Sequence, residues 1–153
     1  RIGLGGIPLA VTGSEDGTVV VWDLVTGERL HSLTGHIGEI RAVGTVIGLG
    51  GIPLAVTGSE DGTVIVWDLA TGEHLHTLTG HTREIRAVGT AIGPGGVPLA
   101  VTASGDGTVI VWDLATGKRL ADYRLKYQPQ TVATTSQGFI VGYRDEVAYF
   151  AFS

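Results

Sequence analysis

A repeat of 45 residues constrains the fold of this chain more than any other feature. Residues 4–45 and 49–90 align without a gap and differ at only six positions, which indicates a recent duplication. A third copy diverges after Leu120, and residues 126–153 form a degraded fourth unit without tryptophan. The sequence VWDL marks the same place in each of the first three units, at Trp22, Trp67 and Trp112. Repetition at this period predicts structural units that stack and share a continuous core.

Each unit carries the pattern of four short β-strands. Apolar and alternating runs separated by turn residues predict strands in the second unit at 39–48, 52–58, 63–69 and 73–78. The Asp-Gly pair before the third strand readily supplies the positive φ of a tight hairpin. Apolar residues do not recur at the 3.6-residue spacing of a helix. The sequence therefore predicts an all-β fold, a β-propeller segment of four-stranded antiparallel blades with about three and a half blades in this chain.

Composition and charge exclude several classes of partner. Only 16% of residues are charged, against about 25% in ordinary domains, so much of the chain should be buried on both faces. The formal net charge is -5 and the ten Lys and Arg residues are scattered, which argues against nucleic acid. No apolar run reaches the ~18 residues of a membrane span, so we expect a cytoplasmic protein with no membrane partner. Cysteine is absent, which excludes disulfides and thiolate metal sites.

Several motifs together resemble the WD-repeat β-propeller family. These are the Gly-His pairs at 35–36 and 80–81, a Ser-x-Asp-Gly turn and a Trp-Asp dipeptide, in highly similar tandem repeats of a bacterial type. The motifs cover residues 1–125, and the remainder resembles the family only in its strand rhythm. The resemblance implies a first blade at 1–35 with a truncated first strand, further blades at 36–80 and 81–125, and a degenerate three-stranded blade at 126–153.

The resemblance also implies a buried hydrogen-bond network within each blade. In the family, the network joins the His of Gly-His, the Ser and Asp of the turn, and the Trp of Trp-Asp. Matching these positions to this sequence gives two complete sets and one set without His: His36, Ser59, Asp61 and Trp67; His81, Ser104, Asp106 and Trp112; and Ser14, Asp16 and Trp22. We expect these residues to be structural, because a buried polar group left unpaired costs ~1–3 kcal/mol.

Chemical interpretations of the same residues fit less well. A nucleophilic serine must be exposed beside an oxyanion hole, whereas these serines recur in near-identical hairpins. The Glu of the Glu-Asp pair is replaced by Gly105 in the third copy, and the loop runs into apolar residues too soon for calcium. His74 and His76 lack a third ligand for zinc, and neither TGKR nor GLGG is followed by the residues of a nucleotide-binding loop. We therefore predict no catalytic, cofactor-binding or metal-binding residues and no cofactor.

The remaining candidate site is a protein-binding surface. Propellers of this family mostly act as rigid platforms, and the loops that lead into the first strand of each blade contact partners most often. The residues at these positions are Ile37, Glu39, Arg41, Arg83, Glu84 and Arg86. The alternative is that their charges are simply solvated, since charges at the rim of an interface contribute little.

The number of strands predicts that the ring is completed from outside this chain. About three and a half blades leave two end faces bare and strand edges unpaired. The chain begins at Arg1 without methionine, so we expect a fragment, the C-terminal part of a larger propeller or multidomain protein. Either upstream blades complete the ring, or two chains associate as a homo-oligomer of about seven or eight blades.

The sequence thus predicts a non-catalytic propeller that serves as a protein–protein interaction scaffold, with another domain or another chain as its partner. Two alternatives stay open. One is a ligand-binding or enzymatic propeller with a site in the central channel, and the other is an engineered or recombined repeat protein. The seven Tyr and Phe residues all lie between Tyr123 and Phe152, which indicates a last blade whose core is filled by rings.

Overall fold

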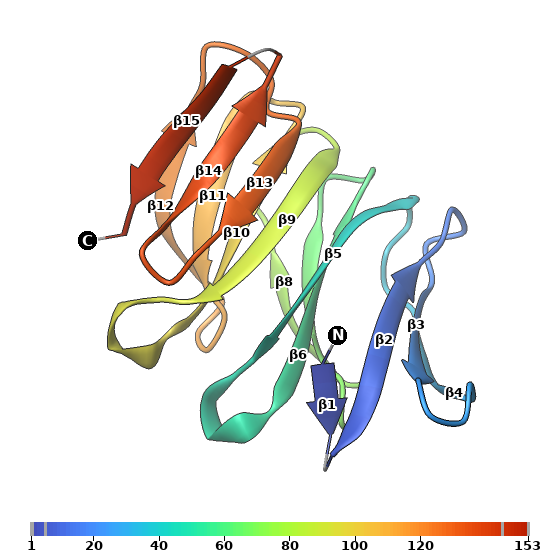
Figure 1. Ribbon diagram of the computed structural model, residues 1–153. Coiled ribbons are helices and arrows are strands. Elements are labelled where there is room, and N and C mark those ends of the chain that lie inside the picture. The colour runs from blue at the N-terminus through green and yellow to red at the C-terminus, as the bar shows by residue number, and fades with distance from the viewer. Residues whose placement is uncertain (1, 5, 145, 153) are drawn as a thin grey trace.

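The computed structural model describes residues 2–4, 6–144 and 146–152 and is all-β, which confirms the predicted fold class. Four antiparallel sheets follow one another along the chain, and Figure 1 shows them side by side in an open arc. The strands of each sheet are adjacent in chain order. Each repeat therefore forms its own small sheet, and the repeats meet face to face.

The strands have the following bounds in the four sheets. The first sheet contains β1 (Ile2–Leu4), β2 (Ile7–Gly13), β3 (Val19–Asp23) and β4 (Arg29–Leu33). The second contains β5 (Ile40–Ile47), β6 (Pro53–Ser59), β7 (Val64–Asp68) and β8 (His74–Leu78). The third contains β9 (Ile85–Ile92), β10 (Pro98–Ser104), β11 (Thr108–Asp113) and β12 (Lys118–Arg124). The fourth contains β13 (Thr131–Thr134), β14 (Gly138–Tyr143) and β15 (Glu146–Ala151).

The strand prediction for the second unit holds to within one residue at each end of β5 to β8. The Asp-Gly turn before β7 is tight because Gly62 adopts a φ of 86°, which a residue with a side chain rarely adopts. Gly17 and Gly107 have φ values of 85° and 86° at the equivalent turns. Short 3-10 turns, η1 (Leu49–Gly51) and η2 (Pro94–Gly96), join the first two strands of the second and third sheets.

Neighbouring sheets bury two different apolar faces against each other. We call the face toward the next sheet along the chain the trailing face, and the face toward the previous sheet the leading face. The trailing face of the first sheet packs Leu9, Val19, Val21 and Leu33 against Ala55, Ile65, Trp67 and Leu69 of the second. The second and third sheets repeat the arrangement with Val56, Val64, Val66 and Leu78 against Ala100, Ile110, Trp112 and Leu114. The core is thus a series of similar inter-sheet layers.

The layer between the third and fourth sheets is built from aromatic rings, as the sequence predicted. Phe139 is buried against Val101, Val109 and Val111, and it stacks on Phe150 with ring centroids 4.9 Å apart. Tyr123 of β12 contacts both rings, at 6.0 Å from Phe139 and 4.7 Å from Phe150. Rings therefore occupy the space that aliphatic side chains and tryptophan fill in the other two layers.

One glycine of the repeat marks a close approach between sheets. A Cβ atom on Gly58 in β6 would collide with Ile85 of β9, 2.4 Å from its Cγ2 atom. The third copy has Ala103 at the equivalent position, and the fourth sheet has the buried Pro129 at the place of Ile85, as the equivalent hydrogen bonds of the two sheets show. The change from glycine to alanine thus follows the change in the neighbouring sheet.

Candidate functional site

The second sheet contains a continuous chain of buried hydrogen bonds. The indole Nε1 of Trp67 donates to Thr57 Oγ1 at 2.8 Å, and the same oxygen lies 2.7 Å from His36 Nε2. The other ring nitrogen of His36, Nδ1, lies 3.0 Å from Thr63 Oγ1, which donates to Asp61 Oδ1 at 2.6 Å. The chain connects the loop before β5 to strands β6 and β7, and so holds the second sheet together.

The donors and acceptors along this chain define the state of the histidine. Thr57 accepts the indole hydrogen and has one hydroxyl hydrogen left, which it donates to His36 Nε2. Nδ1 then carries the hydrogen and donates toward Thr63. A neutral imidazole satisfies every group in the chain, whereas a protonated one would leave the Thr57 hydroxyl hydrogen without an acceptor.

The third sheet repeats this arrangement 45 residues later. Trp112 donates to Thr102 Oγ1 at 2.8 Å, and His81 Nε2 lies 2.7 Å from that oxygen. His81 Nδ1 lies 3.0 Å from Thr108 Oγ1 and 3.2 Å from Asp106 Oδ2. None of the described residues has a buried side-chain nitrogen or oxygen without a partner.

The structure differs from the prediction in the hydroxyl that joins His to Trp. That hydroxyl belongs to Thr57 and Thr102, whereas the expected serines lie in the turns. Ser59 Oγ accepts from the Asp61 amide at 3.2 Å, and Ser104 Oγ donates to the Arg83 carbonyl at 3.1 Å. The serines shape the turn and tie it to the preceding loop, because their short side chains reach only nearby backbone.

The first sheet has an open version of the network. Trp22 donates to Thr12 Oγ1 at 2.8 Å, but Trp22 is only half-buried and Thr12 is exposed. Asp16 accepts from the amide and hydroxyl of Thr18, at 2.9 and 2.6 Å, as Asp61 does from Thr63. Ser14 Oγ lies 3.4 Å from the Asp16 amide. No histidine among the described residues bonds to Thr12, so this sheet has the Asp and Trp without the bridge between them.

Burial and hydrogen bonding shift the acid–base properties of the networks. Burial lowers the pKa of His36 and of His81, and the facing carboxylates of Asp61 and Asp106 oppose this only in part. Burial alone would raise the pKa of Asp61, but hydrogen bonds from Thr63 and from the Ile37 amide outweigh it and lower the pKa to about 2. Neutral histidines and ionised aspartates are therefore the stable pair near pH 7.

These shifts predict a loss of stability in acid. A histidine whose folded pKa is below 6.5 contributes its full stability above that pH and loses it as pH falls through the folded pKa. Asp61 adds a further loss from about pH 4 down to its folded pKa of about 2. Urea titrations between pH 7.5 and 4 should show the free energy of unfolding falling, by up to about 1.4 kcal/mol per pH unit for each histidine. A free energy that is constant between pH 7.5 and 5 would contradict the buried neutral state.

A charged hollow of about 530 Å³ lies where the first strands of three sheets begin. Arg41 at the start of β5 lies 3.4 Å from Glu60 and 3.6 Å from Glu39. In the next sheet Arg86 lies 3.1 Å from Glu84, and Arg83 lies 3.5 Å from the same carboxylate. The hollow is lined by Arg41, Glu60, Arg83, Glu84, Ile85, Arg86 and Gln130. Five of the six predicted binding residues thus lie in the hollow or form an ion pair with a residue that lines it.

The two ion-pair groups differ because the third copy has Gly105 where the second has Glu60. The carboxylate of Glu84 occupies the space that a Cβ atom on Gly105 would need, and there it pairs with Arg86. Glu84 is 22% exposed, whereas the side chains of Arg41 and Arg83 are 46% and 57% exposed. The hollow therefore combines the largely buried carboxylate of Glu84 and the exposed carboxylate of Glu60 with two accessible guanidinium groups.

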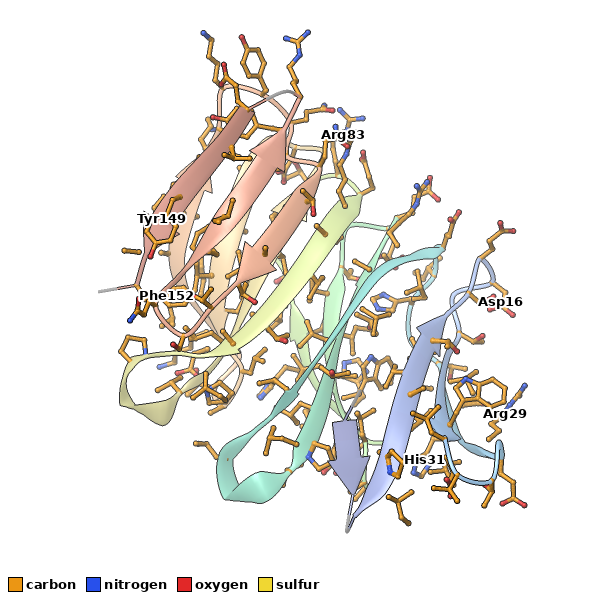
Figure 2. The ribbon with its side chains drawn as sticks, in the orientation of Figure 1. Asp16, Arg29, His31, Arg83, Tyr149 and Phe152 are labelled. Atoms are coloured by element: carbon orange, nitrogen blue, oxygen red, sulfur yellow. The ribbon has the colours of Figure 1, made fainter. Side chains whose placement is uncertain are left out.

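Ile37, the sixth predicted binding residue, is 93% exposed on the loop before β5. Its amide donates to Asp61 Oδ2 at 3.0 Å, so the network fixes the backbone while the side chain stays in solvent. Figure 2 shows Arg83 and Asp16 at the same end of the sheets, with His31 toward the opposite end. The loops before the first strands and the Asp-Gly turns thus form one face of the arc.

Sheets of this topology, repeated in an arc with a Trp–Thr–His–Asp network, define the class of WD-repeat propellers. The family profile of the WD domain, G-beta repeat, matches residues 6–23, 27–68 and 72–113, and the chain belongs to this WD40 family. The crystal structure of the computationally designed Ika4 protein is similar, with a TM-score of 0.78 and 31% identity, over 95% of this chain and 86% of that chain. Comparison with curated proteins gave no match.

WD40 domains generally mediate protein–protein interactions and are generally non-enzymatic. Within the described residues, no group of three or more His, Cys, Asp or Glu side chains is placed to hold a metal ion. No helix in the same part of the chain is long and apolar enough to cross a membrane.

Proposed function

We propose that this chain is a non-catalytic, cytoplasmic interaction scaffold that binds another protein at the charged hollow and the Ile37 loop. The observation that carries the proposal is the exposure of Ile37 beside loops that supply accessible arginines. Arginine is enriched among the residues that dominate binding energy, and an exposed apolar side chain supplies the area that a partner can cover. The hollow contains both signs of charge, which favours orientation and selectivity of the partner.

The buried networks support a scaffold in a second way. The imidazoles of His36 and His81 are bonded on both ring nitrogens within their own sheets. The role of the two networks is to fix the loops that carry Ile37 and Thr82, because Asp61 and Asp106 of these networks accept the amide hydrogens of those two residues. A platform of this kind keeps its binding residues in place before the partner arrives, which reduces the entropy lost on binding.

We also propose that the ring is completed beyond these four sheets, either by further blades of a larger protein or by another chain. The first and fourth sheets each present an apolar face to solvent, which supports this proposal. Such faces normally mark surfaces that are covered by a partner.

Charge reversal at the hollow tests the proposed binding site. Peptides selected from a displayed library on the wild-type chain would be titrated into Arg41→Glu, with Lys118→Glu as the matched control, because Lys118 is an exposed residue of β12 outside the hollow. We expect Arg41→Glu to raise the Kd at least about 10-fold, since it replaces two ion pairs by like charges, and Lys118→Glu to leave it unchanged. Equal Kd values for both variants would contradict binding at the hollow.

A further inference from the structure

The leading face of the first sheet is the same surface that is buried elsewhere in the molecule. In the second sheet, Ala55, Ile65 and Trp67 are no more than 2% exposed under the trailing face of the first. Their counterparts Ala10, Val20 and Trp22 have the same or similar side chains but are only half-buried. Leu24 is 50% exposed, whereas Leu69 at the equivalent position is 1% exposed. The first sheet therefore presents a face whose residues match those of a buried layer.

The trailing face of the fourth sheet is apolar at the opposite end of the arc. Ile140 pairs in register with Ala133 on one side and Tyr149 on the other, which places these three side chains on one face. Ile140 is 42% exposed, Tyr149 60% and Val147 75%. Figure 2 shows Tyr149 on β15, the outermost strand at this end. The other strand residues of this face are Thr131, Gly138, Gly142 and Ala151, so it carries no charge.

Neither end of the arc has the polar outer face that caps a stack of repeats. Both of the inner layers between four-stranded sheets bring a trailing face of Leu and Val onto a leading face of Ala, Ile and Trp. The uncovered trailing face of Ile, Val and Tyr and the uncovered leading face of Ala, Val and Trp are the two halves of one more such layer. Both halves are present in a single chain, so two copies can cover all four exposed faces.

We propose that a second copy of this chain docks head to tail on the first, with the fourth sheet of each copy on the first sheet of the other. The proposed dimer rests on the proposed completion of the ring, and it names a second copy of this chain as the partner that completes it. The contact is heterologous and is made twice, so it closes a ring of eight sheets instead of continuing as a filament. The central channel is then surrounded by both copies, and each contributes one charged hollow.

The molar mass of the chain in solution tests this proposal. Sedimentation equilibrium should give twice the 15.9 kDa of one chain. Val147→Lys and Tyr149→Lys should each raise the dimer dissociation constant at least about 100-fold, because each adds a buried positive charge to a layer whose other half already carries Arg29 over the Trp22 ring. Both side chains are exposed in the single chain, so both variants should keep the wild-type circular dichroism spectrum. Leu49→Lys is the matched control, since it adds a charge at an exposed apolar residue of the 3-10 turn η1, outside both faces.

Three results would overturn the proposal. One is a folded monomer at every concentration, because blades outside this chain would then have to cover the exposed faces of the first and fourth sheets. The second is a dimer that persists in both variants, and the third is a mass that keeps growing with concentration. Peptide binding at the hollow that survives in the monomeric variants would support the proposed function independently. If the chain has the mass of a dimer but its hollow does not bind peptide, the proposed binding site is wrong and the proposed ring of two copies still holds.

Discussion

Thr57→Val should destabilise the protein by about 2–5 kcal/mol, because it leaves two buried groups without partners. The hydroxyl of Thr57 accepts from Trp67 Nε1 at 2.8 Å and lies 2.7 Å from His36 Nε2. Valine has nearly the same shape, so little packing changes and the loss comes from the missing hydrogen bonds. Urea unfolding followed by tryptophan fluorescence measures the change in the free energy of unfolding.

The control for this substitution is Thr57→Ser, which keeps the hydroxyl and removes only a methyl group. We expect Thr57→Ser to cost about 1 kcal/mol, the value for one buried methyl group. If the valine and serine variants lose the same free energy, the methyl group and not the hydroxyl is what matters at Thr57, and the network does not stabilise the sheet.

Phe139→Ala should cost about 3–5 kcal/mol, because Phe139 fills the layer between the third and fourth sheets. The ring is 1% exposed and has three aromatic neighbours, Tyr123, Phe150 and Phe152. Removing it leaves a cavity that strands β13 to β15 cannot close without shifting against β10 and β11. Thermal or urea unfolding monitored by circular dichroism gives the size of the effect.

Phe139→Leu provides a graded comparison at the same position. Leucine keeps most of the apolar volume, so we expect a smaller cost than for alanine. An alanine variant within 1 kcal/mol of the wild type would show that the fourth sheet does not pack on the third through this ring. The aromatic layer would then contribute little to the cohesion of the arc.

The fold could be predicted from the sequence because its determining signals are local and repeated. The Asp-Gly turns require positive φ at Gly17, Gly62 and Gly107, and the apolar runs between them fix the strands. Three copies of one pattern also locate the strand ends, which is why β5 to β8 match their predicted ranges within one residue.

The identity of the bridging hydroxyl could not be predicted in the same way. Thr57 and Ser59 lie two residues apart on β6, so both side chains fall on the same face of the sheet. Only the register of β6 against β7 decides between them: Trp67 pairs with Ala55, which brings its indole to the next residue on that face, Thr57. A signal was present, since threonine stands at this position in all three copies, as Thr12, Thr57 and Thr102.

The charged hollow was still harder to predict from the sequence than the bridging hydroxyl, because its lining residues come together only in the folded chain. Its lining comes from the second, third and fourth sheets, through Arg41, Arg86 and Gln130 among others. The repeat alone places arginines at the start of two first strands, but it does not show that they share one concavity. The exchange of Glu60 for Gly105, which lets Glu84 turn toward Arg86, likewise has meaning only in three dimensions.

Mapping a bound peptide on the isotopically labelled chain is the most direct test of the interaction scaffold. The largest amide chemical-shift changes in nuclear magnetic resonance spectra should fall at Ile37, Arg41, Arg83 and Arg86, with small changes at the buried networks. Changes centred instead on Leu49 and Ile52, at the two ends of the 3-10 turn η1 and outside the hollow, would contradict binding at the hollow and place the interaction site elsewhere.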